Sequence, residues 1–167
     1  MSQQSFINSL PLPAYWCPNG GSYYGKFTLS PWCEEYRKVE EVFYDCIKSN
    51  YYNYNIKNIK RIQNVEFYGK FFLRKQQLAS YEFPTYMRRM LLVLPKDYLH
   101  DALEYNLDER ITNIEMLLQE SVNKKISKGS VVLIVNVLYS NEDDLTMTEC
   151  HPYFSSEHYI EYIIELQ

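Results

Sequence analysis

The sequence predicts an α+β domain, and three features lead to this prediction. Residues 130–139, SVVLIVNVLY, form a continuous apolar and β-branched run, which is typical of a central strand covered on both faces. In residues 159–166, apolar residues alternate with Glu161 and Glu165, which predicts a strand with one buried face and one mostly solvated face. Helical patterns occur between the strand-like segments without a regular βαβ alternation, which favours α+β. In residues 159–166, the apolar residues that alternate with the glutamates are Ile160, Tyr162, Ile164 and Leu166.

The N-terminal region is rich in residues that interrupt regular structure. Residues 1–25 carry three prolines and a Gly-Gly pair, so we expect an extended lead-in that docks through Tyr15 and Trp16. No repeat and no linker divides the rest of the chain, and 167 residues suffice for one sizeable core. We therefore expect an N-terminal extended segment, residues 1–13, followed by one domain, residues 14–167.

A first helix is predicted to begin at Ser30. Its hydroxyl suits an N-cap, and Pro31 suits the first helical turn. The helix should end near residues 49–50, where a polar run begins. Its apolar face would consist of Tyr36, Val39, Phe43, Cys46 and Ile47.

The next segment, residues 54–63, is ambiguous by periodicity alone. Its isoleucines are spaced for a helix, whereas their β-branched side chains favour a strand. Asn64 is a plausible N-cap for a second helix over residues 65–79. In that helix Val65, Tyr68, Phe71 and Phe72 recur at helical spacing.

Residues 88–95, RRMLLVLP, predict a short buried strand that Pro95 closes. A helical turn or two should follow, with Leu99, Ala102 and Leu103 on its apolar side. A further helix is expected after Asn113. Its apolar residues would be Ile114, Leu117, Leu118 and Val122.

Overall composition limits the classes of partner. The chain has 17 basic and 21 acidic residues and a formal charge of −4, so it lacks the net positive charge of a nucleic-acid-binding domain. It also lacks an apolar run of membrane-spanning length and an N-terminal signal peptide. We therefore expect an intracellular protein, nuclear or cytoplasmic, with no membrane partner.

The four cysteines, Cys17, Cys33, Cys46 and Cys150, are too scattered for a disulfide framework, so we expect reduced thiols. Cys150 and His151, together with Cys17 and Cys33, would supply four zinc ligands on paper. However, no CxxC or HxxxH spacing is present, and no metal site is predicted.

Several segments, taken in order, resemble the catalytic domain of the poly(ADP-ribose) polymerase (PARP) family, in particular its mono-ADP-ribosylating members. The first is EEYRKVEEVFYDCI followed by YNIKNIKRIQNVEFYGKFFLRKQQL, in which RIQN, residues 61–64, is the most specific part. LPAYW, NLDERI, KGSVVLIVNVLY and HYIEYIIEL also match family segments in the same order. The resemblance implies an ADP-ribosyltransferase-like fold of mixed, mainly antiparallel sheets with flanking helices, in shortened form, and a strand for residues 54–63.

The resemblance also locates the family's NAD site, which this sequence does not preserve. Active members bind NAD through a His-Gly-Thr stretch, and these positions correspond to Val93, Leu94 and Pro95. The valine side chain has no hydrogen-bonding atom, and proline has no backbone N–H. A ribose hydroxyl buried here would lose its water partners, at a cost of about 1–3 kcal/mol.

Two further family features are missing or weak. The segment that carries the nicotinamide-stacking tyrosine is shortened, and Glu115 falls roughly at the aromatic position. The third catalytic position, a glutamate in polymerising members, falls near Glu149, which is better explained as an exposed loop carboxylate because Pro152 interrupts the local strand pattern. We therefore expect no NAD cofactor and no catalytic residue.

Other residues suggest binding surfaces. Lys57, Lys60 and Arg61 lie among aromatic residues, a mixture that can contact RNA, although basic side chains on a solvated surface are commonplace. Tyrosine is frequent, 17 of 167 residues, and aromatic residues are enriched at protein interfaces. The best candidates for a docking patch are Tyr15, Trp16, Tyr23, Tyr24 and Trp32, with plain packing of the segment as the alternative.

The sequence thus favours a catalytically inactive PARP-like domain, a pseudoenzyme that serves as a protein-interaction or scaffolding module and is open to self-association. One alternative is a mono-ADP-ribosyltransferase that uses NAD in a rearranged site. A second is an RNA-binding adaptor.

Overall fold

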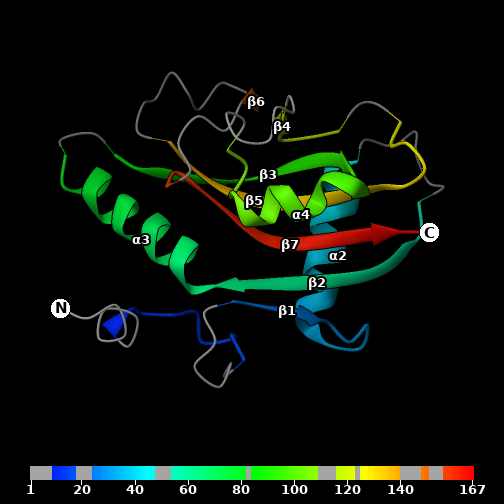
Figure 1. Cartoon of the computed structure of the whole chain (residues 1–167), viewed down its shortest axis with the longest axis horizontal. Coiled ribbons are helices and arrows are strands. Elements are labelled where there is room, and N and C mark those ends of the chain that lie inside the picture. The colour runs from blue at the N-terminus through cyan, green and yellow to red at the C-terminus, as the bar shows by residue number, and fades with distance from the viewer. Residues whose placement is uncertain are drawn as a thin grey trace.

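A computed structural model of the chain describes residues 9–17, 24–47, 54–81, 84–108, 116–122, 125–139, 148–150 and 156–167. These residues form three α-helices and one sheet with the strand order β1-β2-β7-β5-β3-β4-β6 (Figure 1). Every pairing between neighbouring strands of this sheet is antiparallel. The α+β prediction is therefore confirmed. The strands are β1 Tyr24–Thr28, β2 Ile56–Asn64, β3 Tyr86–Pro95, β4 Leu118–Gln119, β5 Ser130–Tyr139, β6 Glu149–Cys150 and β7 His158–Leu166. The helices are α2 Glu34–Cys46, α3 Val65–Ala79 and α4 Leu99–Glu104, which a 3-10 turn, Lys96–Tyr98, precedes.

Strand β5 lies at the centre of the sheet, between β7 and β3. All of its residues except Ser130 are buried, as its continuous apolar sequence predicts. It pairs with β3 over the whole length of both strands, from Tyr86 opposite Tyr139 to Pro95 opposite Ser130. This pairing makes β3 longer than the strand expected from its sequence.

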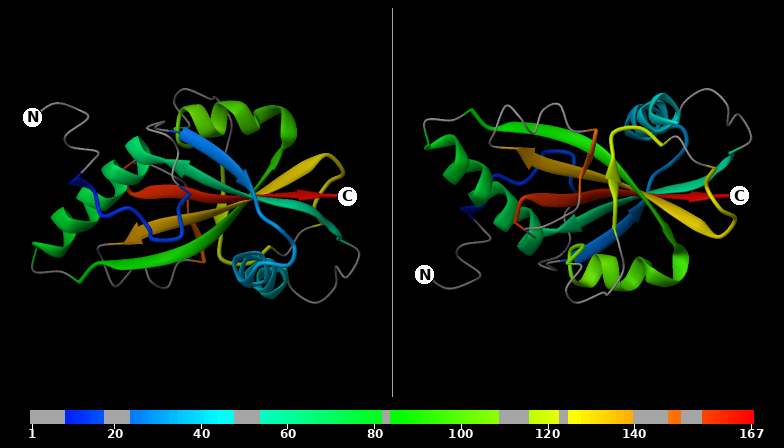
Figure 2. Two further views of the ribbon diagram at one scale, coloured as in Figure 1. Left: turned by 90° about the horizontal axis from the view of Figure 1, so that it is seen from below. Right: turned by 90° about the horizontal axis from the view of Figure 1, so that it is seen from above.

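The two faces of the sheet carry different helices (Figure 2). On one face, Leu133 and Val135 of β5 pack with Ala102 and Leu103 of α4. On the other face, Ile134 packs with α2, and Leu138 packs with α3. Since Ile134 and Leu138 are four residues apart in the same strand, α2 and α3 cover successive parts of one face.

The region from β2 to α3 matches the sequence prediction closely. Residues 56–64 form a strand, which resolves the ambiguity left by periodicity, and α3 follows at once. The Asn64 side chain accepts a hydrogen bond from the backbone N–H of Phe67 at 3.0 Å, which confirms the predicted N-cap.

Helix α2 begins later than predicted. Its N-cap is Cys33, whose sulfur accepts from the backbone N–H of Tyr36 at 3.4 Å. Ser30 instead closes a preceding turn, in which its carbonyl accepts from the N–H of Cys33. The predicted apolar face is confirmed, because Tyr36, Val39 and Phe43 are buried.

The prediction of one solvated face on the last strand is wrong. Both Glu161 and Glu165 are buried, as are all other residues of β7 except Leu166. Opposite β5, Tyr162 faces Ile134 and Ile160 faces Val135, so Glu161 is the extra residue of a β-bulge. The bulge breaks the alternation and places Ile160 and Tyr162 in cores on opposite faces.

The predicted helix after Asn113 is also wrong where the structure describes it. Leu118 and Gln119 form strand β4, in which Gln119 faces Leu91 and Leu118 faces Cys150. Val122 makes an isolated parallel bridge with Ile47. Its backbone N–H donates to the carbonyl of Cys46 at 2.8 Å. Pairing with distant segments therefore outweighs the local helical spacing of the apolar residues.

The N-terminal residues described, 9–17, contain turns, with hydrogen bonds from Leu12 N–H to Leu10 O and from Trp16 N–H to Pro13 O. Strand β1 then pairs with β2 at one edge of the sheet, although the sequence did not predict a strand there. None of the described helices combines the length and the apolar character needed to cross a lipid bilayer.

Candidate functional site

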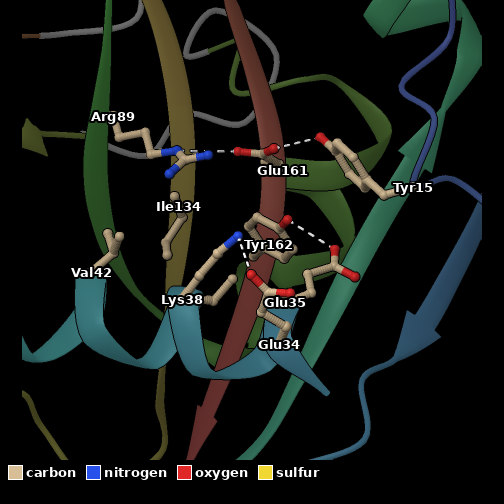
Figure 3. Close-up of a pocket in the computed structure, with 10 residues that line it drawn as sticks. Tyr15, Glu34, Glu35, Lys38, Val42, Arg89, Ile134, Glu161 and Tyr162 are labelled. Carbon is tan, nitrogen blue, oxygen red and sulfur yellow. Dashed lines mark hydrogen bonds and ion pairs between the residues drawn. The ribbon is translucent and has the colours of Figure 1, made fainter.

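A pocket of about 330 Å³ lies on the face of the sheet that carries α2 (Figure 3). The first turns of α2 form one wall, and the sheet forms the floor. The aliphatic side chains of the pocket are Val39, Val42 and Ile134. The polar side chains are Tyr15, Glu34, Glu35, Lys38, Arg89, Glu161 and Tyr162. The pocket thus joins an N-terminal residue to α2 and to three neighbouring strands of the sheet.

A buried carboxylate, that of Glu161, lies at the inner end of the pocket and is only 5% exposed. It accepts hydrogen bonds from the Tyr15 hydroxyl at 2.8 Å and from Asn136 Nδ2 at 3.0 Å. The Nε atom of Arg89 lies 3.5 Å from its second oxygen. These groups replace part of the water that a buried carboxylate loses, and the β-bulge in β7 positions the side chain to meet them.

A second buried charge, the guanidinium of Arg61, supports the pocket from β2. Arg61 is 4% exposed and pairs with Glu35 through Nη1 at 2.5 Å. Its Nε donates to Gln63 Oε1 at 3.1 Å, and the other Glu35 oxygen accepts from the Tyr162 hydroxyl at 2.9 Å. Burial alone would lower the pKa of Arg61, but its hydrogen bond to Glu35 and the charge of that carboxylate raise the pKa overall.

The tyrosines around this network are held in the neutral form. Burial raises the pKa of Tyr162, and the charges of Glu161 and Glu35 raise it further. Burial likewise raises the pKa of Tyr15, and so do the charge of Glu161 and the hydrogen bond to it. The tyrosine hydroxyls therefore act as hydrogen-bond donors at neutral pH, Tyr162 to Glu35 and Tyr15 to Glu161.

The N-terminal segment contacts the sheet through both residues that the sequence singles out for docking. Tyr15 bonds to Glu161, whereas the Trp16 ring lies 5.1 Å from the Tyr68 ring and 6.3 Å from the Tyr159 ring. Next to them, the backbone N–H and carbonyl of Cys17 bond to the side-chain amide of Gln63, each at 2.9 Å. Trp16 is therefore half-buried against α3 and β7 and does not stand free as a docking residue.

The three positions that the sequence resemblance aligns with the NAD-binding stretch of PARP-family enzymes lie at the end of β3. Val93, Leu94 and Pro95 face Val132, Val131 and Ser130 of β5. Leu94 is buried in the core beneath α4, and Val93 packs against the α2 core. Val93 is four residues from Arg89 along the strand, which is about 13 Å. The polar pocket is therefore a different place from the end of β3.

Of the other two positions that the resemblance assigns to that site, Glu149 does not line the pocket. Glu149 is exposed at the edge of the sheet, where its side chain accepts from Gln119 Nε2 at 2.8 Å. Glu115 lies outside the described residues.

The remaining aromatic candidates differ widely in exposure. Trp32 is 91% exposed, in the turn between β1 and α2. Tyr24 is exposed on β1, where Lys26 Nζ lies 5.8 Å from the centre of its ring. Tyr23 lies outside the described residues. Of the candidates that the structure describes, Trp32 is the most exposed.

The basic residues proposed for RNA contact do not form one exposed patch. Lys60 and Arg61 are consecutive in β2 and point to opposite faces of the sheet. Lys60 pairs with Glu165 at 2.7 Å, and Arg61 is buried against Glu35. Only Lys57 is exposed. These three residues therefore do not present a shared set of free cations for the RNA contact that was considered as an alternative.

All four cysteines are free thiols. The cysteines considered as zinc ligands are far apart in the sheet order: the Cys17 sulfur accepts from Arg61 of β2, whereas Cys150 lies on β6. His151 lies outside the described residues. Among the described side chains, the metal-ligating atoms that come together are those of His100, Asp101 and Glu104, on the surface of α4.

Sequence reasoning missed most of the pocket. It singled out Tyr15, but it assigned Glu161 to a solvated face and did not connect Glu35 or Arg89 with it. One signal was available in the sequence: a glutamate inside the strongly apolar YIEYIIEL segment needs a partner if the sheet is covered on both faces.

Comparison with models of known protein families and with curated proteins finds no match to this chain.

Proposed function

We propose that this chain is a PARP-like domain that has lost ADP-ribosyl transfer and acts as a protein-interaction module. The family assignment depends on the ordered sequence segments described above. The antiparallel sheet and the succession of strand β2, the Asn64 cap and helix α3 are consistent with it. The proposal that catalysis has been lost depends on the residues at the end of β3.

At this end of β3, neither the side chains nor the nearby backbone supply the polar groups that a nicotinamide nucleotide needs. Val93 and Leu94 contribute only aliphatic side chains. Pro95 has no N–H, and the N–H of Lys96 already donates to the Gly129 carbonyl at 3.0 Å. A nucleotide placed there would lose hydrogen bonds to water without replacement.

The interaction role is supported by Trp32. Tryptophan supplies a large amphipathic contact area and is frequent among residues that dominate binding energy. A side chain of this size that is 91% exposed buries almost no apolar area within the chain. It lies in a turn next to the edge strand β1, so a partner can reach it without displacing a core element.

Pull-down from the native source with the full chain tests the interaction role. We expect Trp32→Ala to lose the specific partners, because truncation of a central interface tryptophan commonly costs 2 kcal/mol or more, about thirtyfold in affinity. Leu73→Ala is the matched control, since Leu73 is an exposed apolar residue on α3. Retention of every partner by the Trp32 variant would overturn this part of the proposal.

Catalysis is tested separately, with labelled NAD and the purified chain. We expect no transfer of label to the chain or to added proteins under conditions in which an active PARP-family enzyme modifies itself. Incorporation of label that survives denaturing electrophoresis, and that does not occur when the chain is denatured before the reaction, would contradict the pseudoenzyme proposal and favour a rearranged transferase site.

A further inference from the structure

The polar pocket contains one strong hydrogen-bond donor group, the guanidinium of Arg89, that is only partly engaged within the described chain. The Nε atom of Arg89 lies 3.5 Å from the Glu161 carboxylate, and its Nη atoms make no hydrogen bond to a described residue. The side chain is half exposed and reaches the pocket from β3 (Figure 3). The outer edge of this guanidinium is therefore available to a ligand.

The buried carboxylates of the same pocket are already engaged. Both oxygens of Glu35 accept hydrogen bonds, one from Arg61 and one from Tyr162. Both oxygens of Glu161 also accept, one from Tyr15 and one from Asn136. These carboxylates therefore do not need further hydrogen-bond donors from a ligand, whereas the guanidinium of Arg89 can still donate to one. A ligand that brings oxygen acceptors would complete its hydrogen bonding.

Charge at the pocket is balanced before any ligand enters. Glu34, Glu35 and Glu161 are matched by Lys38, Arg61 and Arg89. The Lys38–Glu34 pair lies on the exposed rim, where an ion pair contributes little and Lys38 can turn toward an incoming anion. Recognition would thus depend on directed hydrogen bonds from Arg89 and would be weak for a small ligand.

The wall next to Arg89 is apolar. Val39 and Ile134 are buried and Val42 is half-buried, and all three line the pocket. At about 330 Å³ the pocket is at the small end of the range of ligand sites, about 300–1,000 Å³. The geometry suits a short branched aliphatic group joined to a planar oxyanion.

We propose that this pocket binds a carboxylate joined to a short aliphatic group. The Nη atoms of Arg89 form a two-pronged contact with the carboxylate oxygens. Val39, Val42 and Ile134 contact the aliphatic part. The ligand is either a free small acid or a carboxylate of a peptide, since both offer the same chemistry. This site does not involve the end of β3 and does not depend on the loss of NAD binding.

The test is a titration of the ¹⁵N-labelled chain with isovalerate, followed by NMR. We expect a saturable shift of the Arg89 Nε–H signal and of amides in the first turns of α2. Isovaleramide has the same shape without the charge and should bind at least about tenfold more weakly. Equal binding of the amide, or no saturation up to about 100 mM isovalerate, would overturn the proposal.

Variants separate the site from general charge effects. Arg89→Gln should weaken isovalerate binding by at least about tenfold, and Arg89→Lys should weaken it less because it keeps the charge but not the planar fork. Arg88→Gln is the matched control, because Arg88 is the neighbouring arginine and points to the opposite face of β3. If Arg89→Gln does not fold, the loss of isovalerate affinity in Arg89→Lys still tests the contribution of the planar guanidinium group. Equal affinity of the Arg88 and Arg89 variants would overturn the assignment.

Two peptide arms identify the source of the carboxylate. One is an acetylated tripeptide that ends in leucine with a free C-terminus, and the other is an amidated peptide with an internal glutamate beside leucine. Binding of either peptide more tightly than isovalerate supports the proposal and assigns the ligand to that peptide class. Binding of isovalerate alone supports a free small acid.

Discussion

The hydroxyl of Tyr15 donates a 2.8 Å hydrogen bond to the carboxylate of Glu161, which lies 146 residues later in the chain. This bond connects the N-terminal segment to the last strand across the inner end of the polar pocket. It also satisfies one oxygen of a carboxylate that is almost completely buried. The segment that precedes β1 is therefore part of the folded domain at this point.

Removal of this hydroxyl should destabilise the domain. Tyr15→Phe leaves the ring in place but removes a donor to a buried charged group, which should lower the free energy of unfolding by about 1–2 kcal/mol. Urea denaturation measures the change. Tyr81→Phe is the control, because Tyr81 is 60% exposed, and it should stay within about 0.5 kcal/mol of the wild type. Equal stabilities of the two variants would show that the Tyr15–Glu161 bond contributes nothing.

The buried ion pair of Arg61 with Glu35 should be more sensitive still. Glu35→Gln leaves the Arg61 guanidinium buried without its counter-charge, which should cost about 3–5 kcal/mol. The neighbouring change Glu34→Gln breaks only an exposed pair with Lys38 and should cost less than about 1 kcal/mol. Denaturation of the two variants side by side gives the difference. A Glu35 variant as stable as the Glu34 variant would mean that water reaches Arg61.

Buried tyrosines should make the domain sensitive to alkali. Burial raises the pKa of Tyr159 and that of Tyr162, so the folded state keeps two protons that the unfolded state loses above about pH 10. The contribution of these two tyrosines to the free energy of unfolding is fully present below pH 10. Above pH 10, the free energy of unfolding falls by about 1.4 kcal/mol per pH unit for each tyrosine.

The variant Tyr159→Phe isolates one of these two groups. Above pH 10, we expect the free energy of unfolding of this variant to fall less steeply with pH than that of the wild type, by about 1.4 kcal/mol per pH unit. Loss of the hydrogen bond from the Tyr159 hydroxyl to the Ile62 carbonyl lowers the stability equally at every pH and does not change the slope. Denaturation at a series of alkaline pH values measures the slope. An unchanged slope would mean that Tyr159 ionises in the folded state as easily as in the unfolded state.

Glu165 should show the opposite behaviour in acid. Burial alone would raise its pKa, but hydrogen bonds from Lys60 and Asn58 lower the pKa overall. This carboxylate therefore adds stability above its unfolded pKa, and the contribution is lost as pH falls.

Lys60→Gln removes the main cationic partner, so we expect the pKa of Glu165 to rise from its lowered value and the stabilisation to shrink. Carbon-detected NMR titration of the carboxyl group measures this pKa. Lys57→Gln, on the same strand, is the control, because Lys57 is exposed and should leave the pKa of Glu165 in place. A similar shift in both variants would point to general charge effects.

The sequence predicted those elements whose signals are local. Asn64 caps α3 because the cap and the helix are adjacent in the chain, and β5 is identified by a run of apolar residues that no surface strand would carry. Strand β4 was predicted as a helix because its structure is decided by pairing with Leu91 and Cys150, which are distant in sequence. The β-bulge at Glu161 also depends on such pairing, and no period-2 pattern reveals it.

In the candidate site, too, local signals were predicted from the sequence and contacts between distant segments were not. Tyr15 was singled out as an aromatic residue in the irregular N-terminal segment, whereas its partner Glu161 was expected to face solvent. Arg61 was considered as part of a basic surface. A sequence shows neither that β2 is covered by the N-terminal segment nor that Glu35 lies beside Arg61. The assignment of buried charges requires knowledge of both faces of the sheet.

The most direct test of the central claim is a thermal-shift titration of the whole chain with NAD, with an active PARP-family enzyme as the positive control. A ligand at a hundred times its dissociation constant stabilises the folded state by about 2.7 kcal/mol, which corresponds to a rise in Tm of about 5–10 °C for a domain of this size. Because the end of β3 offers Val93, Leu94 and Pro95 in place of polar groups, we predict no concentration-dependent rise. A saturable rise in Tm with NAD would contradict the account.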